Sequence, residues 1–377
     1  MSDGNFTNNV PRDRYDRPCI YPAPARGKTH ADVVERYAKQ KKLPKSYRRT
    51  TKFISVLEDN FNLERWSQRM VARGVSERPD LVDATMGIPD IDTREGKDAL
   101  DFVVKDARAH MRTSLKANKG SYLHHCTEIL DRDGDNAELP SPAEWASLQN
   151  GHVDLRDDDY TSEERDADIA AYLAVKQRYG LRYYTIEQMR VYDPWQVAGT
   201  PDRSGTGTDE RISGKHMILD VKTGDVDWDN TQREIAMQLA MYAHSTPYTN
   251  EQGRLEDVPP VNRQKAVVIH LPTGEARCEL HFVDIARGWA GCLRAQEVWE
   301  WRKFKAMFVK VDEWEPGNHL ERLAMNPSYA EAAMSCTSKA DLRALWERAV
   351  AGLALTDDFK AAVRKRLSEL ETKEGAA

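Results

Sequence analysis

The chain has 377 residues, with 55 lysines and arginines against 61 aspartates and glutamates, which gives a formal net charge of −6. No apolar run approaches the ~20 residues of a membrane helix, and the N-terminus lacks the apolar stretch of a signal peptide. The cysteines are odd in number and scattered, which favours reduced thiols; they are Cys19, Cys126, Cys278, Cys292 and Cys336. We therefore expect a cytoplasmic protein without membrane contact, with two compact units or one unit with appendages.

The first third of the chain divides by composition. Residues 1–50 are predicted to form a basic, mobile arm, because lysines and arginines dominate and several prolines interrupt it. Such an arm can attract a phosphate backbone or can be a solvated tail, and the sequence favours neither. Residues 51–117 show apolar positions at helical spacing with breaks at Gly74, Gly87 and Pro89, which predicts a packed helical layer.

The stretch 118–130 carries the first candidate ligand. If it is helical, Gly120, His124 and Glu128 lie on one face, and the glycine leaves room for a strand end or a DNA backbone. A helical histidine is more often a structural residue than a ligand, so this signal is weak alone. The residues that follow, 131–168, are rich in aspartate and glutamate, which predicts an acidic linker or surface insertion.

A short buried strand is predicted where Met217–Leu219 is followed by Asp-Val-Lys and closed by a Thr-Gly turn. Side chains alternate along a strand, so Asp220 and Lys222 point to one face and Val221 to the other. Asp202, in the sequence Gly-Thr-Pro-Asp, is expected to end the preceding strand. Residues 203–215 are then a polar loop between the two strands.

Two carboxylates and one ammonium group at a strand edge suit the hydrolysis of a phosphate ester. Carboxylate oxygens hold Mg²⁺ or Mn²⁺, which generates hydroxide and neutralises charge on the phosphoryl oxygens. A lysine can orient the attacking water or stabilise the transition state. A bare Asp-x-Lys is more often an ordinary ion pair, so the surrounding pattern decides between the two interpretations.

Further elements flank this strand. One strand is predicted over Arg182–Tyr192, carrying Glu187, with a return strand over Gln196–Pro201. On a predicted amphipathic helix over 229–245, Gln238 and Tyr242 are four residues apart and share a face. The remaining predicted elements are a hairpin over 265–283, a helix from Asp284 to about Lys310, and a helical region over 328–373.

Taken in order, these motifs are Gly120-x-x-x-His124, a strand with Glu187, Gly199-x-x-Asp202, Asp220-Val-Lys222 and Gln238-x-x-x-Tyr242. The set resembles the RecB-like branch of the PD-(D/E)XK nuclease superfamily, which includes phage-encoded recombination exonucleases and CRISPR-associated adaptation nucleases. The resemblance covers roughly residues 115–305. It implies an α/β fold, with a restriction-endonuclease-like mixed central sheet flanked by helices in a core over 118–310. Helical additions are expected at both ends, the C-terminal one over 311–377.

The resemblance also implies roles for single residues. His124, Asp202, Asp220 and the carbonyl of Val221 would bind Mg²⁺ or Mn²⁺, and Lys222 would act with the two acids in catalysis. The remaining matched positions would lie at the substrate; they are Gln238, Tyr242, Glu187 and Gly120.

One departure from the family pattern concerns cysteine. Many relatives hold an iron–sulfur cluster with four cysteines, three of them closely spaced after the core. Here Cys278 and Cys292 are far apart and no Cys-x-x-Cys exists, so we expect no iron–sulfur cluster. The adaptation role of the cluster-bearing relatives is correspondingly less expected.

The expected function is that of a metal-dependent DNA exonuclease in recombination, replication or repair, acting on linear ends of single- or double-stranded DNA. A protein partner in recombination is compatible with this role, and a phage-encoded protein would act in the host cytoplasm. Two alternatives stay open. One is a structure-specific endonuclease, and the other is a catalytically silent DNA-binding or assembly protein on the same fold.

Overall fold

The computed structural model of the chain describes residues 10–304, apart from 150, 152, 228 and 256–257, and then 310, 332–334, 336, 338–351 and 357–374. The chain divides into two compact units, Met1–Cys292 and Leu293–Ala377. The first unit contains both large sheets and every residue that the sequence nominated for the site.

The first sheet has five strands in the order β12-β11-β8-β7-β4. Only β8 and β11 are parallel in this sheet; the other neighbours are antiparallel. The predicted strand with Asp-Val-Lys and the predicted hairpin over 265–283 are confirmed as β8, β11 and β12. The strand bounds are β4 Arg182–Ile186, β7 Arg203–Thr206, β8 Met217–Lys222, β11 Lys265–His270 and β12 Glu279–Asp284.

A second sheet was not expected from the sequence. Its order is β10-β9-β5-β6-β3, and β3 and β6 are its parallel pair. A further two-stranded sheet joins β1 to β2. The strand bounds are β1 Cys19–Ile20, β2 Lys45–Ser46, β3 Arg48–Arg49, β5 Arg190–Tyr192, β6 Val197–Gly199, β9 Thr246–Thr249 and β10 Gly253–Arg254. The α/β class is therefore correct, with two mixed sheets in place of one central sheet.

The second sheet exists because the strand predicted over Arg182–Tyr192 is broken. Glu187 has φ of 50°, a left-handed conformation that interrupts an extended chain. The residues before it form β4 in the first sheet, and those after it form β5 in the second. The predicted return strand is β6, reached through the short helix η2 at Asp193–Trp195.

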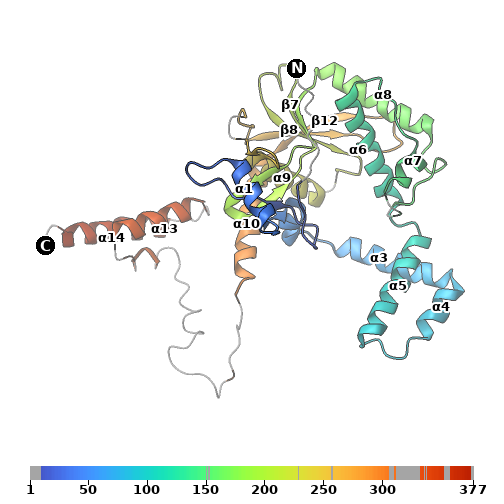
Figure 1. Cartoon of the computed structure of the whole chain (residues 1–377), viewed down its shortest axis with the longest axis horizontal. Helices are drawn as coiled ribbons and strands as arrows, with labels where there is room; N and C mark the ends of the chain where they lie inside the picture. The colour runs from blue at the N-terminus through green and yellow to red at the C-terminus, as the bar shows by residue number, and fades with distance from the viewer. Residues whose placement is uncertain are drawn as a thin grey trace. The chain divides into compact units, whose positions relative to one another are not determined.

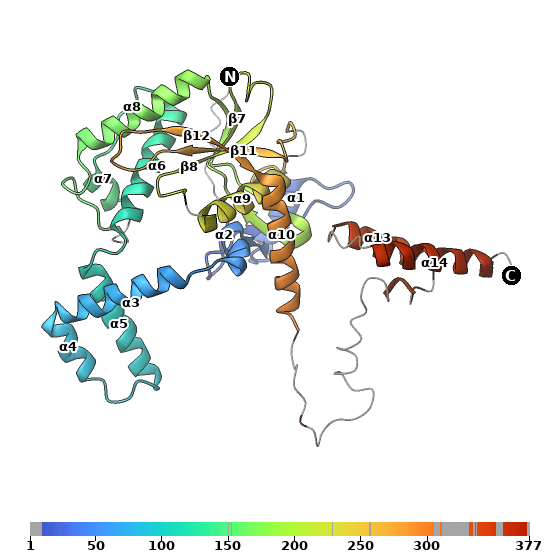
Figure 2. The same ribbon diagram turned by 180° about the vertical axis from the view of Figure 1, so that it is seen from behind.

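Helices cover both faces of the first sheet. Met217, Leu219 and Val221 of β8 point into a core shared with α6 and α8, whereas α9 contacts β8 and also β5 of the second sheet. Figures 1 and 2 show α6, α7 and α8 grouped at one side of the sheet and α9 at another. The helix bounds are α6 Leu115–Asp133, α7 Pro142–Ser147, α8 Ser162–Tyr179 and α9 Asp229–His244.

The segment 131–168, predicted to be an acidic linker or surface insertion, contributes several side chains to the core of the first sheet. Trp145, Leu155 and Tyr160 are buried in the core of the first sheet. The buried carboxylate of Asp168 accepts hydrogen bonds from Tyr160 and from backbone amides of the β11–β12 turn. The aspartates on the surface outnumber these few buried side chains, which is why composition alone was misleading.

The basic N-terminal segment, predicted to be a mobile arm over 1–50, contributes apolar side chains to the core of the second sheet. Ile20 and Tyr47 pack against the second sheet in a core with Val191 and Tyr248. The first nine residues lie outside the described part of the chain. The helices here are α1 His30–Lys39, α2 Thr50–Ile54 and η1 Ser55–Leu57.

The predicted helical layer is confirmed as α3 Phe61–Ser76, α4 Pro79–Met86 and α5 Arg94–His110. These helices share a small core of their own around Leu81, Val103 and Ala107.

In the C-terminal region, α10 covers Ile285–Trp301, shorter than predicted; residues 305–309 lie outside the described part. The helical region predicted over 328–373 contains α13 Lys339–Ala351, capped by Ser338, and α14 Asp357–Glu374. Residues 311–331 also lie outside the described part. Among the described helices, none combines the length and apolar character that crossing a bilayer requires.

Candidate active site

Three potential metal ligands from distant parts of the chain meet beside β8. The ligand atoms of His124, Glu187 and Asp202 all lie within 4.8 Å of one another. Nε2 of His124 is 3.1 Å from Oε1 of Glu187, and Nδ1 is 3.7 Å from Oδ2 of Asp202. An imidazole between two carboxylates is a donor set that suits Mn²⁺ or Mg²⁺.

Local backbone geometry positions the two carboxylates. Glu187 donates its backbone amide to the carbonyl of Asp202 at 2.8 Å, so the end of β4 is tied to the start of β7. Asp202 therefore precedes a strand and does not end one, and the loop predicted over 203–215 begins as β7. The backbone amide of Val221 donates to Oδ2 of Asp202 at 2.6 Å, which fixes this carboxylate against β8.

A second group of side chains continues along β8 to α9. Nζ of Lys222 lies 2.7 Å from Oδ2 of Asp220 and donates to Oε1 of Gln238 at 3.2 Å. Nε2 of Gln238 donates to the hydroxyl of Tyr242 at 3.1 Å. The side chain of Asp220 is only 1% exposed, whereas that of Lys222 is 27% exposed. The ammonium group can therefore reach a bound molecule while its partner stays buried.

The charges of these groups act on one another. Burial disfavours the protonated imidazole of His124, but the carboxylate of Asp202 and the hydrogen bond to Glu187 outweigh burial and raise its pKa to about 9. Burial and the nearby charge of Asp202 raise the pKa of Asp220 above its ordinary value, against the opposing effect of Lys222. The negative charges of Asp202 and Asp220 repel each other, so a cation bound between these two carboxylates is favoured.

The sequence did not predict the network of buried side chains that supports the site. Arg203 and Asp131 are both fully buried and form an ion pair, Nε to Oδ2, at 2.7 Å. Tyr172 and Lys176 also donate to Asp131, at 2.6 and 2.9 Å. Arg203 in turn donates to the backbone carbonyl of Asp202 at 3.0 Å, and its Nη1 lies 3.8 Å from Oε1 of Glu187. The network therefore connects α6 and α8 to the backbone of Asp202 and to the carboxylate of Glu187.

The spacing of residues on α6 could have predicted part of this network. His124, Thr127 and Asp131 follow at helical spacing and share one face. Thr127 accepts a hydrogen bond from Arg203 at 3.3 Å, so the face that carries the imidazole also carries its support.

Two glycines permit close packing at the site. A Cβ at Gly120 would lie 2.4 Å from Oγ1 of Thr223, directly after β8, so the close approach is to a strand end. Of the two partners expected for Gly120, a strand end or a DNA backbone, the structure shows the strand end, and its contact with substrate stays a prediction. A Cβ at Gly199 would lie 2.7 Å from a ring carbon of Tyr242, so this glycine leaves room for the tyrosine.

The compact ligand group differs from the predicted one. The prediction placed Asp220 with His124 and Asp202, and Glu187 with the substrate; the structure brings Glu187 into the group and pairs Asp220 with Lys222. The signal for Glu187 was its position before the Gly-x-x-Asp stretch. The carbonyl of Val221 as a ligand stays a prediction.

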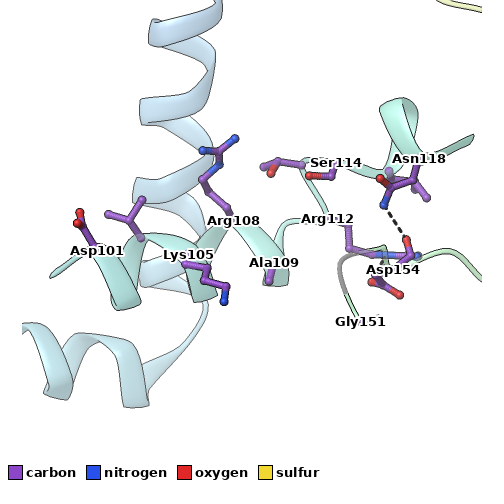
Figure 3. Close-up of a pocket in the computed structure, with 12 residues that line it drawn as sticks. Asp101, Lys105, Arg108, Ala109, Arg112, Ser114, Asn118, Gly151 and Asp154 are labelled. Carbon is purple, nitrogen blue, oxygen red and sulfur yellow. Dashed lines mark hydrogen bonds and ion pairs between the residues drawn. The ribbon is translucent and has the colours of Figure 1, made fainter. Parts of the chain in front are cut away.

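A cavity of about 510 Å³ lies near the start of α6, between α5 and the segment after α7. Figure 3 shows Lys105 and Arg108 on α5 facing this region, and Asn118 bonded to the carbonyl of Asp154. Asn118 is six residues before His124, roughly 9 Å along the helix. The cavity is therefore separate from the ligand group.

Comparisons with known proteins add little. No protein-family model and no curated protein sequence matches the chain. Among solved structures, the chain is similar to one described as "Crystal structure of SSO0001", with 9% sequence identity and a TM-score of 0.20. That likeness covers 53% of this chain and 86% of the other. Because the TM-score is so low, it carries no argument about function.

Proposed function

We propose that the chain is a metal-dependent DNA exonuclease of the RecB-like PD-(D/E)XK type, with a restriction-endonuclease-like core built on the first sheet. The observation that carries the proposal is a convergence of distant residues. His124 comes from α6, Asp202 directly precedes β7, and the Asp220–Lys222 pair comes from β8. They meet in one connected group. An ordinary surface ion pair would not gather these four positions.

The residues present fit a divalent cation. His124, Glu187 and Asp202 would hold it, with the neighbouring carboxylate of Asp220 adding negative charge. This oxygen-rich set with one imidazole matches the preference of Mn²⁺ and Mg²⁺. When bound, such an ion activates water and neutralises charge that develops on phosphoryl oxygens.

The remaining side chains have roles of their own. Asp220 and Gln238 hold the ammonium group of Lys222 from two sides, at 2.7 and 3.2 Å, so its position is fixed before substrate arrives. From there Lys222 can donate to a phosphoryl oxygen or orient the attacking water. Tyr242 is buried and fixes Gln238 through its hydroxyl, so it acts as a positioning residue.

A DNA substrate is supported by charge as well as by chemistry. Lys105 and Arg108 are exposed beside the cavity that precedes the site along α6. Basic side chains on the surface attract a phosphate backbone even when the net charge of the chain is negative, and these two lie on the approach to the site along α6 and not in the site itself.

The test is digestion of end-labelled linear, nicked and circular DNA with and without Mn²⁺. We expect linear DNA to be degraded from its ends only with the metal. Asp220→Ala and Lys222→Ala should lower turnover by about 10²–10³-fold, the usual effect of removing a group that stabilises transition-state charge. Lys265→Ala, an exposed lysine on β11 of the same sheet, is the matched control and should keep full activity.

Each other outcome selects an alternative. Cleavage of circular DNA would indicate an endonuclease. Binding of DNA without cleavage at any metal concentration would indicate a silent assembly protein. Equal turnover in the wild type and Lys222→Ala would overturn the assigned role of the lysine.

A further inference from the structure

A second group of potential metal ligands lies at the far edge of the first sheet. His270 is on β11, and Glu279 and His281 are on the edge strand β12. Their ligand atoms all lie within 4.8 Å of one another, and the two imidazole rings are 5.8 Å apart. None of these residues takes part in the site described above.

The strand register explains why they meet. His270 pairs with Glu279 across the antiparallel strands, and His281 pairs with Val268, two residues along β11. Directly paired residues in neighbouring strands point to the same face, as do residues two apart on one strand. All three side chains therefore share a face, and the group forms without any loop.

The hydrogen bond of His270 leaves one ring nitrogen available. Its Nε2 lies 3.0 Å from the carbonyl oxygen of Gly224. A carbonyl only accepts, so Nε2 carries the proton and Nδ1 keeps its lone pair. A backbone carbonyl that fixes the other nitrogen is the usual support of a metal-binding imidazole. His270 is also buried, which holds the ring in place.

Space for a bound ion and its further ligands lies next to the group. His281 lines a cavity of about 390 Å³ between β12 and the start of α9. Asp227 and Asp229 line the same cavity, together with Arg233 and Arg287. Glu279 meets Arg277 at 3.1 Å, but both side chains are about half exposed, and exposed ion pairs of this kind contribute little.

We propose that His270, Glu279 and His281 form a second metal site, selective for a transition ion of the Zn²⁺ class. Two imidazoles and one carboxylate are a softer donor set than the group at His124 and leave open coordination positions for water. His270 is on β11, which pairs directly with β8, and its register partner there is Lys222. Glu279 and His281 lie one strand farther out, on the side of the sheet opposite to β7. The three ligands are distinct from His124, Glu187 and Asp202, so Zn²⁺ binding to them does not depend on the proposed nuclease function.

The test is equilibrium dialysis of the full, chelator-treated chain against Zn²⁺, with excess Mg²⁺ present. We expect His281→Ala and Glu279→Gln each to weaken one Zn²⁺ site by about 10–100-fold or more. Both residues are half exposed, so the variants should fold; circular dichroism checks this. His124→Ala should keep the same site, which distinguishes it from the first ligand group.

The matched control is His110→Ala. His110 also forms an exposed pair with a glutamate, Glu77, at 3.2 Å, but is not part of a three-ligand group among the described residues. It should leave Zn²⁺ binding unchanged. Wild-type Zn²⁺ affinity in both His281→Ala and Glu279→Gln, or a loss of the site in His124→Ala alone, would overturn the proposal.

Discussion

The two ligand groups of the first sheet differ in what holds them. The group at His124 is assembled from three separate elements and supported by the buried Arg203–Asp131 pair, whose side chains are fully buried. The group at His270 is assembled by the register of two neighbouring strands, and two of its side chains are about half exposed. One is therefore fixed by tertiary packing, and the other by local strand pairing.

The difference teaches where each site is vulnerable. At the first group, a change far from the ligands can move them, because Arg203 contacts the backbone of Asp202 and lies close to Glu187. At the second group, only the ligands themselves and the tether to Gly224 matter. Paired substitutions in the two regions separate these cases.

The largest expected effect is on stability. Arg203→Met leaves the carboxylate of Asp131 buried without its main cationic partner, which should lower the free energy of unfolding by about 3–5 kcal/mol. Arg277→Met, beside the second group, breaks only the exposed ion pairs with Glu275 and Glu279 and should change the free energy of unfolding by less than about 1 kcal/mol. Urea unfolding measures both. Similar losses of unfolding free energy in the two variants would contradict the proposed difference between the two ligand groups.

A smaller effect is expected on metal affinity at the first group. Glu187→Gln removes one anionic ligand from the cluster and should weaken Mn²⁺ binding by about 10–100-fold, measured by calorimetry. Glu279→Gln makes the same change in the second group and should leave the Mn²⁺ site intact. If Glu187→Gln binds Mn²⁺ as the wild type does, the ligand set must be redrawn around Asp220.

The smallest effect concerns a histidine that belongs to neither group. His244 stacks on Trp289 with ring centroids 3.8 Å apart, and burial, with a contribution from Arg263, lowers its pKa to about 4. Its unfolded pKa is about 6.5, so its stabilisation is full above that pH and is lost as pH falls from 6.5 towards 4.

Between pH 7 and pH 5 the wild type should therefore lose roughly 1 kcal/mol more stability than His244→Gln, allowing for partial exposure. Urea unfolding of both proteins at the two pH values measures the difference, and other titrating groups cancel. An equal loss in both would show that burial alone does not suppress protonation there.

The parts of the fold that local patterns encode were predictable. The apolar run of β8, the turn of the β11–β12 hairpin and the amphipathic pattern of α9 each lie within a few residues. In the site, the pairs Asp220–Lys222 and Gln238–Tyr242 are local as well, so their spacing alone places them on shared faces.

The features of the fold that the sequence did not predict depend on residues far away in the chain. β7 reads Arg-Ser-Gly-Thr, a polar sequence that becomes a buried strand because Asp131, far away in the chain, neutralises Arg203. The break at Glu187 depends on a positive φ, and the residue type of glutamate gives no indication of that conformation. The segment before residue 50 is mostly basic, but it also contains a few apolar side chains that pack in the core of the second sheet.

The place of β3 in the second sheet sets a practical limit on shortening the protein. β3 pairs with β6, and Thr50 directly after it lies where a Cβ on Gly199 would come within 2.5 Å. Gly199 in turn backs the ring of Tyr242. A shortened protein that starts near residue 118, where the apparent catalytic region begins, would therefore lack the edge strand β3. The packing behind Tyr242 would then be open to water.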